Sequence, residues 1–433
     1  MSTVVEVDEC DEPSSMITLS LCRTLAQEAK LASRHLAVAR GSAKNAWLKG
    51  SATALLDRRE EVLSANARDV QAAPAQGLNA AAIDRLMLNS RRIDDMAQTL
   101  LEVAALPDPI GETVTSSKRP NGLEVKQVRV PLGVIFMIYE SRPNVTVDAA
   151  ALCVKSGNSV ILRGGKEAIH TNRALHRILA DELIQCGLPE QAVQLIATID
   201  RAAVGELLRL PEFIDLAIPR GGESLIRRVA AEAKMPVLKH YQGNCHVYVD
   251  ARCDFDMAIK IILNSKVQRP GVCNAAETLL VHHAIAPVFL PKAAEALIQE
   301  GVELRGDPVS CKIVSRMKVA EPADWDTEFL DRILAVAVVE SIDEAIDHIT
   351  FHGSGHTEAI VTSDLAAAQR FVNEVDSSAV MVNASTRFND GSQLGLGAEI
   401  GISTDKIHAR GPCGLRELTS TKWIVVGEGQ VRV

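Results

Sequence analysis

The order of apolar and polar positions divides the chain into a helical N-terminal part and a longer part in which strands and helices alternate. Residues 17–105 carry apolar side chains at helical spacing, as in Ala54-Leu55-Leu56, and predict several helices. Glu112–Val130 instead alternates Thr and Val around a central Pro-Asn-Gly and predicts a hairpin. From Gly133 onward, the alternation predicts a parallel, doubly wound sheet with ligands beyond the C-terminal ends of its strands.

The second half of the chain repeats this alternation, which indicates an α/β fold throughout. The predicted strands are Val134–Tyr139, Ser159–Leu162, Ala192–Ile196, Ile214–Ile218, His246–Val249, Thr278–Val281, Ile333–Val339, Ala359–Thr362 and Ala379–Val382. The predicted helices are Val145–Ser156, Glu167–Gln185, Arg201–Arg209, Glu223–Ala233, Phe255–Val267, Pro287–Gln299, Ile342–Ile349 and Leu365–Glu374. A last apolar segment, Thr421–Val433, predicts a strand that pairs with the hairpin or with a neighbouring subunit.

Composition and charge narrow the class of protein. The 433 residues are enough for two or three domains, and 47% hydrophobic with 23% charged residues is typical of a globular protein. The net charge of -9 argues against a nucleic-acid or anionic-membrane surface, and no apolar run reaches the ~18 residues of a membrane span. We therefore expect a cytoplasmic protein. Met1–Ser15 is acidic and poor in large apolar residues, which predicts a disordered tail.

One of the nine cysteines has the surroundings of a nucleophile. Cys273 follows Arg269-Pro270-Gly271 and precedes an apolar run, so its thiol is expected at an exposed loop tip with a backbone N–H able to donate. Arg269 and Lys266 nearby would favour the reactive thiolate. The alternative is a buried structural thiol, the commoner fate of a cysteine. No CxxC pair is present, and no disulfide framework is expected.

Two glycine-rich loops follow predicted strands at equivalent places. They read Arg163-Gly164-Gly165-Lys166 and Arg220-Gly221-Gly222-Glu223-Ser224. Backbone amides and a cation at a strand-to-helix junction can bind phosphate, so the pair indicates a nucleotide diphosphate. Each loop alone could be a tight turn. No G-x-G-x-x-G follows a strand, so the standard dinucleotide fingerprint is absent.

Three further features have both a structural and a functional interpretation. Asn144, at the head of a helix, is either an N-cap, which the local sequence favours, or an amide donor for an oxyanion hole. His348, His352 and His356 have i, i+4, i+8 spacing, but the glycines after His352 break the helix, and no metal site is predicted. The polar stretch Asn383–Gly391 is either a surface loop or binds a substrate carboxylate through Arg387.

Several strings together closely resemble the γ-glutamyl phosphate reductase family, also called glutamate-5-semialdehyde dehydrogenases, within the aldehyde dehydrogenase superfamily. They run in order from about Ile17 to Trp423 and cover nearly the whole chain. The strings are Pro131-Leu132-Gly133-Val134, Tyr139-Glu140-Ser141-Arg142-Pro143-Asn144-Val145-Thr146, Ile161-Leu162-Arg163-Gly164-Gly165-Lys166-Glu167, Ile218-Pro219-Arg220-Gly221-Gly222, Gln268-Arg269-Pro270-(x2)-Cys273-Asn274, Phe371–Ala379, Val382–Phe388 and His408–Pro412.

The resemblance implies an aldehyde dehydrogenase-like fold and NADPH-dependent reduction of L-glutamyl 5-phosphate to L-glutamate 5-semialdehyde, the second step of proline biosynthesis. It implies Cys273 as the nucleophile, with Asn144 and the Cys273 N–H as oxyanion donors. We expect an NADP-binding domain at 17–111 and 131–250 and a catalytic domain at 251–411. The hairpin 112–130 and the segment 412–433 would form an oligomerisation element, and 1–16 a disordered tail.

The resemblance also assigns binding residues. Cations at the adenosine-ribose position suit NADP, although a neighbouring glutamate, Glu167, leaves NAD open. The cofactor-binding residues would be Arg163, Lys166, Arg220, Gly221, Gly222, Ser224 and Glu328, and the cations for substrate carboxylate and phosphate Arg142, Arg269 and Arg387. Glu328 resembles the glutamate that holds the nicotinamide ribose, and a surface helix charge is an equal alternative.

One absence favours the phosphorylating reaction. Hydrolytic aldehyde dehydrogenases carry a water-activating glutamate in the stretch that matches Val237–Asn244, which here holds no carboxylate. A hydrolytic NAD(P)-dependent semialdehyde dehydrogenase, with His240 as the base, is the alternative function. A non-catalytic scaffold is less consistent with the presence of both Cys273 and Asn144. The chain has no room for a fused kinase, so a separate glutamate kinase would be the partner that supplies the acyl phosphate. Self-association is expected from the oligomerisation element.

Overall fold

The computed structural model describes residues 15–140, 142–198, 200 and 202–432, which form two compact units. Unit 1 comprises Met1–Lys239, Gly395–Gly401 and Cys413–Val433, and unit 2 comprises His240–Leu394 and Ile402–Pro412. The boundary therefore lies at residue 239 rather than at the expected 250, and Gly395–Gly401 returns to unit 1. The predicted tail lies outside the described residues, apart from its last positions, which begin the first helix.

A four-stranded parallel sheet forms the centre of unit 1. Its order is β5 (Val193–Leu195), β4 (Ser159–Arg163), β3 (Val134–Tyr139) and β6 (Leu216–Arg220). The chain builds outward from β3 to β5 and then returns to place β6 on the other side of β3. This reversal is the topological switch point of a doubly wound sheet, where ligands bind beyond the strand C-termini.

Helices cover both faces of this sheet, and every residue of β3 is buried. Val134, Phe136 and Ile138 pack against α1 (Ser15–Leu36), α8 (Ala202–Leu207) and α9 (Glu223–Glu232). The alternate residue Tyr139 bonds Thr146 of α6 (Asn144–Lys155), which places α6 on the opposite face. A continuous apolar strand is what a sheet covered on both faces requires.

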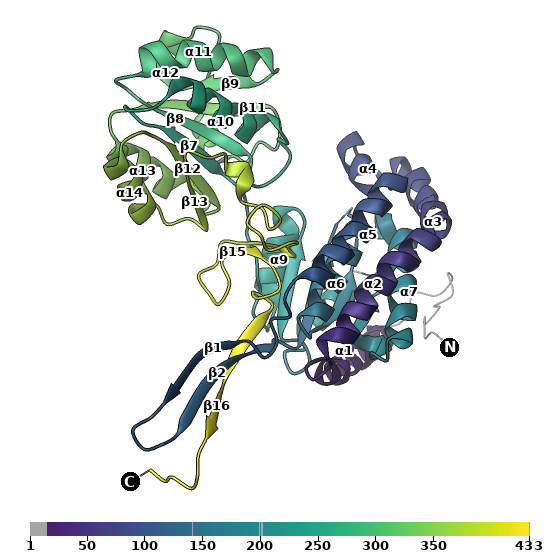
Figure 1. Ribbon diagram of the computed structural model, residues 1–433. Helices are drawn as coiled ribbons and strands as arrows, with labels where there is room; N and C mark the ends of the chain where they lie inside the picture. The colour runs from purple at the N-terminus through teal and green to yellow at the C-terminus, as the bar shows by residue number, and fades with distance from the viewer. Residues whose placement is uncertain (1–14, 141, 199, 201, 433) are drawn as a thin grey trace. The chain divides into compact units, whose positions relative to one another are not determined.

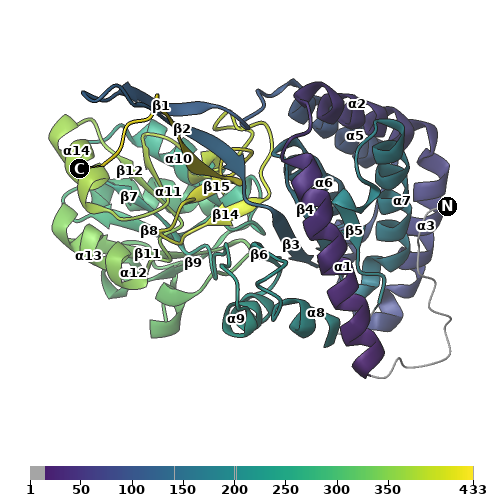
Figure 2. The ribbon, with the colours of Figure 1, turned by 90° about the horizontal axis from the view of Figure 1, so that it is seen from below.

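Of the remaining helices of unit 1, α7 lies beside α6 and contacts β5, while α2 and α5 pack against α6, and Figure 2 shows α2, α5 and α7 side by side. The helices and short 3-10 turns are α2 (Gly41–Asp57), α3 (Arg59–Ala72), η1 (Pro74–Gln76), α4 (Ala80–Leu86), α5 (Ser90–Ala105), η2 (Lys166–Ala168), α7 (Ile169–Gln185) and η3 (Glu190–Ala192).

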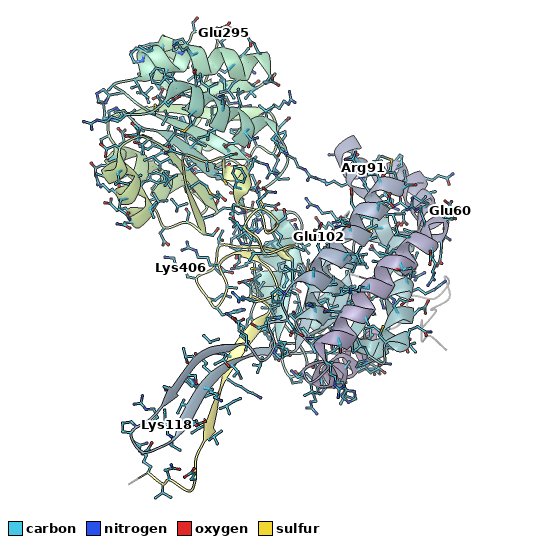
Figure 3. All side chains as sticks on the ribbon, in the orientation of Figure 1. Glu60, Arg91, Glu102, Lys118, Glu295 and Lys406 are labelled. Atoms are coloured by element: carbon cyan, nitrogen blue, oxygen red, sulfur yellow. The ribbon has the colours of Figure 1, made fainter. Side chains whose placement is uncertain are left out.

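Three antiparallel strands form an arm that projects from the helices of unit 1 (Figure 1). The arm consists of β1 (Thr113–Lys118), β2 (Glu124–Pro131) and β16 (Thr419–Val426), with β2 in the centre. Lys118 lies toward its tip, and side chains project from the strands along its length (Figure 3). The predicted hairpin is confirmed, and the C-terminal strand pairs with it.

Unit 2 contains a seven-stranded sheet that is parallel throughout. Its order is β10 (Lys318–Val319), β9 (Glu303–Gly306), β11 (Ile333–Val339), β8 (Ala276–His282), β7 (Cys245–Val249), β12 (Thr357–Val361) and β13 (Ala379–Val382). The chain also forms η4 (Pro322–Asp326), η5 (Thr386–Phe388), and the pair β14 (Gly401–Ser403) and β15 (Gly411–Cys413).

Successive side chains along each strand point to opposite faces of this sheet, and a separate hydrophobic core covers each face. Val247, Leu279 and Val336 pack with α10 (Phe255–Val267), α11 (Ala286–Gln299) and α12 (Pro308–Ile313). Tyr248 and Leu280 pack with α13 (Ile342–His352) and α14 (Leu365–Glu374). The predicted parallel α/β architecture is therefore confirmed in both units.

Two chemical observations complete the description of the fold. None of the eight described cysteines forms a disulfide. Among the described residues, no helix combines the length and the apolar character needed to cross a membrane.

Candidate active site

Cys273 lies half-exposed in the turn between α10 and β8, as its sequence surroundings predict. The turn precedes β8, so the thiol lies at the N-terminal edge of the second sheet. The thiol is not the buried structural cysteine of the alternative interpretation.

The segment leading into β7 supports the backbone of Cys273. A Cβ atom on Gly243 would come within 1.9 Å of the Cys273 carbonyl oxygen, so only glycine fits there without a shift of the turn. The Cys245 thiol donates to the same carbonyl at 3.2 Å. Asn244 anchors the segment, because its amide donates to the carbonyls of Trp325 at 2.7 Å and His352 at 2.8 Å. Gly243, Asn244 and Cys245 together therefore fix the position of the Cys273 backbone.

Lys266, seven residues before Cys273 in the chain, pairs with a buried carboxylate rather than with the Cys273 thiol. Its ammonium group is fully buried and donates to Glu277 at 2.5 Å, so its charge is compensated within the core. Burial lowers the pKa of Lys266 and raises that of Glu277, and the charge of each residue opposes the shift of its partner. The expectation that Lys266 favours the thiolate of Cys273 is therefore wrong. Arg269 is exposed in the turn itself.

Arg387 lies next to the neighbours of Cys273. Its guanidinium donates to the side chains of Asn274 and, at 2.8 Å, Gln268. Together with Gln268 and Phe388 it lines an open pocket of about 280 Å³. The surface-loop alternative for 383–391 is wrong, because Ser385, Thr386 and Asn389 are buried. The loop packs inward and presents Arg387 beside the Cys273 turn.

Two histidines lie beside Cys273: His240, the possible base of the alternative hydrolytic function, and His356, which the sequence placed only in the rejected i, i+4, i+8 set. One potential ligand atom each from His240, Cys273 and His356 lie within 4.8 Å of one another. His356 is fully buried, whereas His348 and His352 stay on α13, where they contact each other. Of the three histidines with i, i+4, i+8 spacing, only His356 therefore lies at Cys273. The signal for the observed cluster lies in the sheet, because these residues precede β7, β8 and β12, which are neighbours only after folding.

In unit 1, the loops after β3 and β6 meet at the switch point. The Gly222 N–H, at the start of α9, donates to a carboxylate oxygen of Glu140 at 3.0 Å. Arg220 ends β6 and donates to the Ile400 carbonyl at 3.4 Å, and a Cβ on Gly221 would clash with Glu140. Sequence reasoning gave Glu140 no role, since only the strand order shows that its loop meets the glycine loop.

The other predicted cofactor residues of unit 1, Arg163, Lys166 and Ser224, lie at the same edge of this sheet. Arg163 ends β4, half-buried, and donates to the Gly164 carbonyl at 2.9 Å. Lys166 is exposed in η2, and Ser224 is exposed in the first turn of α9. Two half-buried arginines, an exposed lysine and glycine amides at a switch point are groups that can bind the phosphates of a dinucleotide.

Asn144 is the first residue of α6 and is exposed. The N-cap interpretation is wrong, because Pro143 occupies that position and no side chain caps the helix. The amide instead donates to Asp148 at 2.8 Å. Burial raises the pKa of Asp148 to about 6, against the effects of the Asn144 hydrogen bond and the charge of Arg220. Arg142 lies half-buried two residues earlier.

Comparisons with known proteins agree with this geometry. The model of the aldehyde dehydrogenase family matches residues 18–310. The γ-glutamyl phosphate reductases of Desulfatibacillum aliphaticivorans and Rhodopirellula baltica are 57% and 56% identical, over 94% and 95% of this chain and 98% and 95% of their own lengths. The crystal structure of γ-glutamyl phosphate reductase from Thermotoga maritima, 47% identical, superposes with a TM-score of 0.93 over 95% of this chain and 100% of that one.

The chain belongs to the aldehyde dehydrogenase family, among its γ-glutamyl phosphate reductases. The expected fold class is thereby confirmed, and membership implies a nicotinamide cofactor. The individual site residues remain predictions. This holds above all for the pairing of Asn144 with the Cys273 N–H, since the two residues belong to different units.

Two further expectations from the aldehyde dehydrogenase family concern carboxylates. Glu328 lies half-buried in the irregular segment between η4 and β11, so the surface-helix alternative is wrong, while its predicted contact with ribose is untested. Its charge contributes to the raised pKa of Glu277. The stretch before β7, where hydrolytic members carry their glutamate, brings His240 rather than a carboxylate to Cys273.

Proposed function

We propose that this chain reduces L-glutamyl 5-phosphate to L-glutamate 5-semialdehyde with NADPH and releases phosphate, through a thioester on Cys273. The observation that carries the proposal is the Cys273 turn, with a half-exposed thiol and a backbone fixed by Gly243 and Cys245. Its occurrence in a chain 57% identical to a γ-glutamyl phosphate reductase supports the same reaction.

Cys273 acts first, as the acyl acceptor. Its thiolate attacks the acyl carbon of the substrate, the C–O bond to phosphate breaks, and phosphate leaves with the electron pair of that bond. The product is a thioester on Cys273. After reduction of the thioester, the resulting thiohemiacetal anion collapses to the aldehyde and returns the thiolate.

The negative charge that develops on the acyl oxygen requires donors. The Cys273 N–H and the Asn144 amide are proposed for this task, and loss of one such donor costs on the order of 10²–10³ in rate. Asn144 would have to leave Asp148, to which its amide donates. Arg387, beside the turn, would hold the substrate carboxylate, leaving Arg269 and Arg142 for the phosphate.

The cofactor is proposed to be NADP, bound at the switch point of the unit 1 sheet. When bound, the nicotinamide ring supplies the hydride. Arg163 and Lys166 would meet the 2′-phosphate, the Arg220–Ser224 loop the pyrophosphate, and Glu328 the nicotinamide ribose. The Gly222 N–H donates to the carboxylate of Glu140, and its ability to donate to an anionic oxygen supports this proposal.

The second candidate function is hydrolytic oxidation of a semialdehyde. It would need a base that activates water against the thioester. His240 belongs to the cluster at Cys273 and is the residue that could serve. Its imidazole donates through Nδ1 to the Ile402 carbonyl at 2.9 Å, which leaves Nε2 to accept a proton.

A phosphate-dependence assay separates the two functions. The purified chain is expected to reduce NADP with L-glutamate 5-semialdehyde when phosphate is present and to show no turnover without it. Cys273→Ala should abolish this reaction while NADP binding persists, whereas the half-buried Cys311→Ser should leave it unchanged as the matched control. Turnover without phosphate would establish the hydrolytic reaction, and activity in Cys273→Ala would show that another group is the nucleophile.

Three finer expectations accompany the proposal. A separate kinase would deliver the unstable acyl phosphate, the arm would mediate self-association, and the cytoplasm would be the compartment. The exposed apolar row on β16 supports the second of these.

A further inference from the structure

The cluster at the edge of the second sheet has a composition of its own. It joins one thiol and two imidazoles, from His240, Cys273 and His356, with their potential ligand atoms within 4.8 Å. Each residue precedes one of three adjacent parallel strands, since β8, β7 and β12 are consecutive in the sheet. The sheet register therefore brings Cys273 and His356 together directly, because β8 and β12 begin within three residues of them, whereas His240 lies five residues before β7.

His240 is oriented by the main chain. Its Nδ1 lies 2.9 Å from the Ile402 carbonyl, and a carbonyl oxygen can only accept, so Nδ1 carries the proton. In the neutral ring the lone pair is then on Nε2. In metal sites, the histidine nitrogen that does not bind the metal commonly donates its N–H to a backbone carbonyl or a carboxylate, and Nδ1 of His240 makes this contact.

His356 is oriented by a chain of hydrogen bonds. The Thr357 hydroxyl oxygen lies 2.7 Å from Nδ1 of His356 and accepts from Asn389 at 2.7 Å. The same hydroxyl bonds Cys245, whose thiol donates to the Cys273 carbonyl. Each hydrogen bond in this chain has one donor and one acceptor when Nδ1 of His356 donates to Thr357 and Thr357 donates to the Cys245 sulfur. The lone pair of His356 is then also on Nε2.

The neighbouring thiols of Cys245 and Cys273 differ in whether they can bind a cation. Cys245 is fully buried, and its hydrogen bond to the Cys273 carbonyl uses the thiol proton. Cys273 is half-exposed and stands at the histidines. Cys273 is thus the thiol that can exchange its proton for a cation, with Cys245 as part of its support.

We propose that His240, Cys273 and His356 form a binding site for a thiophilic divalent cation of the zinc class, which reversibly blocks the nucleophile. Thiolate and imidazole are the ligands that select zinc, and three protein ligands leave a fourth position for water. Binding replaces the Cys273 thiol proton with a sulfur–metal bond and releases the proton to solvent. The blocking effect rests on the proposed function of Cys273, whereas the binding itself does not.

Cobalt(II) is the probe, because a thiolate–cobalt bond gives a charge-transfer absorption that imidazole alone does not. The cofactor-free full chain is expected to bind one Co²⁺ with this absorption and to lose the band on addition of Zn²⁺. Cys273→Ser should lose the band, and His240→Gln and His356→Gln should weaken binding by at least about tenfold. Thr357→Val, which removes only the hydroxyl that orients His356, should weaken it about 10–100-fold. His352→Gln, on α13 beside His348, is the matched control and should bind like the unaltered chain.

A second measurement needs no variant and covers the case in which a substitution of the buried His356 prevents folding. Zn²⁺ should slow alkylation of Cys273 in the unaltered chain, leave Cys253 labelling unchanged, and inhibit turnover in a way that a chelator reverses. Absence of the band, or equal affinity in the His240 and His352 variants, would overturn the site. Metal binding combined with full activity of Cys273→Ala would instead retain the site and reject the proposed nucleophile.

Discussion

At the residue scale, the position of Cys273 depends on a residue that carries no side chain. Gly243 packs against the backbone of Cys273 so closely that an added Cβ would lie 1.9 Å from its carbonyl oxygen and 2.6 Å from its Cα. The obstacle is backbone, which cannot rotate away as a flexible side chain can. The reactivity of the thiol is therefore coupled to a glycine thirty residues earlier in the chain.

Gly243→Ala should displace the Cys273 turn. We expect a loss of reductase activity on the order of 10²-fold, the cost of a shift of about 1 Å at a reacting group, and a destabilisation of about 1–3 kcal/mol from overpacking. Steady-state kinetics and urea unfolding measure the two effects. Gly271→Ala is the matched control, because its Cβ would meet nothing closer than the Leu330 carbonyl at 3.7 Å. Equal activity in the two variants would show that the Gly243 contact does not position the nucleophile.

The sequence is informative about Cys273 itself and much less so about its surroundings. Its Pro-Gly turn is a local signal, and the structure places it in that turn. Gly243, His240 and His356 contact the site through the sheet, so no local spacing identifies them. Lys266 shows the opposite error, since its closeness in sequence suggested a contact with the thiol, whereas helix geometry directs it into the core toward Glu277.

At the element scale, a buried ion pair joins the end of α10 to β8 on either side of the Cys273 turn. Lys266 and Glu277 are both fully buried, with Nζ and Oε2 at 2.5 Å, and Phe329 lies over the ammonium group at 5.9 Å. A buried pair has lost its hydration, so each charge depends on the other. The pair thereby fixes how the helix enters the turn and how the strand leaves it.

Replacing only one residue of the Lys266–Glu277 pair should lower the free energy of unfolding more than replacing both. Lys266→Met alone leaves a buried carboxylate, and we expect a loss of about 3–5 kcal/mol in the free energy of unfolding. The double variant Lys266→Met, Glu277→Leu should recover most of this loss. Urea unfolding of the full chain tests the comparison. The exposed pair Lys318–Glu303 is the control, and its disruption should cost at most about 1 kcal/mol. A double variant as unstable as Lys266→Met would contradict the role of the uncompensated charge.

Element prediction succeeded where the sequence itself carries an apolar run or a helical apolar spacing, and it failed where the sequence carries neither. The predicted helices Phe255–Val267 and Leu365–Glu374 and strands Ile333–Val339 and Ala379–Val382 agree with the structure residue for residue. The stretch 303–319 was missed, although it forms β9, α12 and β10. β9 reads Glu-Leu-Arg-Gly and β10 has two residues, so neither gives an apolar run. Their pairing in the sheet, rather than their own propensity, makes them strands.

At the scale of the whole molecule, the arm of β1, β2 and β16 has features of an interaction surface. β16 is an edge strand, and it exposes Trp423 (62%), Ile424, Val425 and Val426 on successive positions. An edge with unpaired backbone groups and apolar side chains tends to pair with another chain unless charges protect it. Two such arms can align their edges around a two-fold axis. The sequence predicted the strands of the arm, but which edge remains open follows only from the strand order.

Trp423→Lys should therefore weaken self-association of the full chain. We expect the unaltered protein to sediment as a species larger than the 46.6 kDa chain, and the variant to dissociate at concentrations at which the unaltered protein remains assembled. A lysine on the edge removes apolar area and adds charge repulsion between two copies.

Phe351→Lys is the matched control, since it replaces an aromatic side chain that is 81% exposed on α13 of unit 2 and should leave assembly unchanged. An unaltered chain that sediments as a monomer, or equal dissociation in both variants, would rule out β16 as the assembling edge. Retention of Co²⁺ binding in the dissociated variant would in turn show that the cluster around Cys273 forms within a single chain.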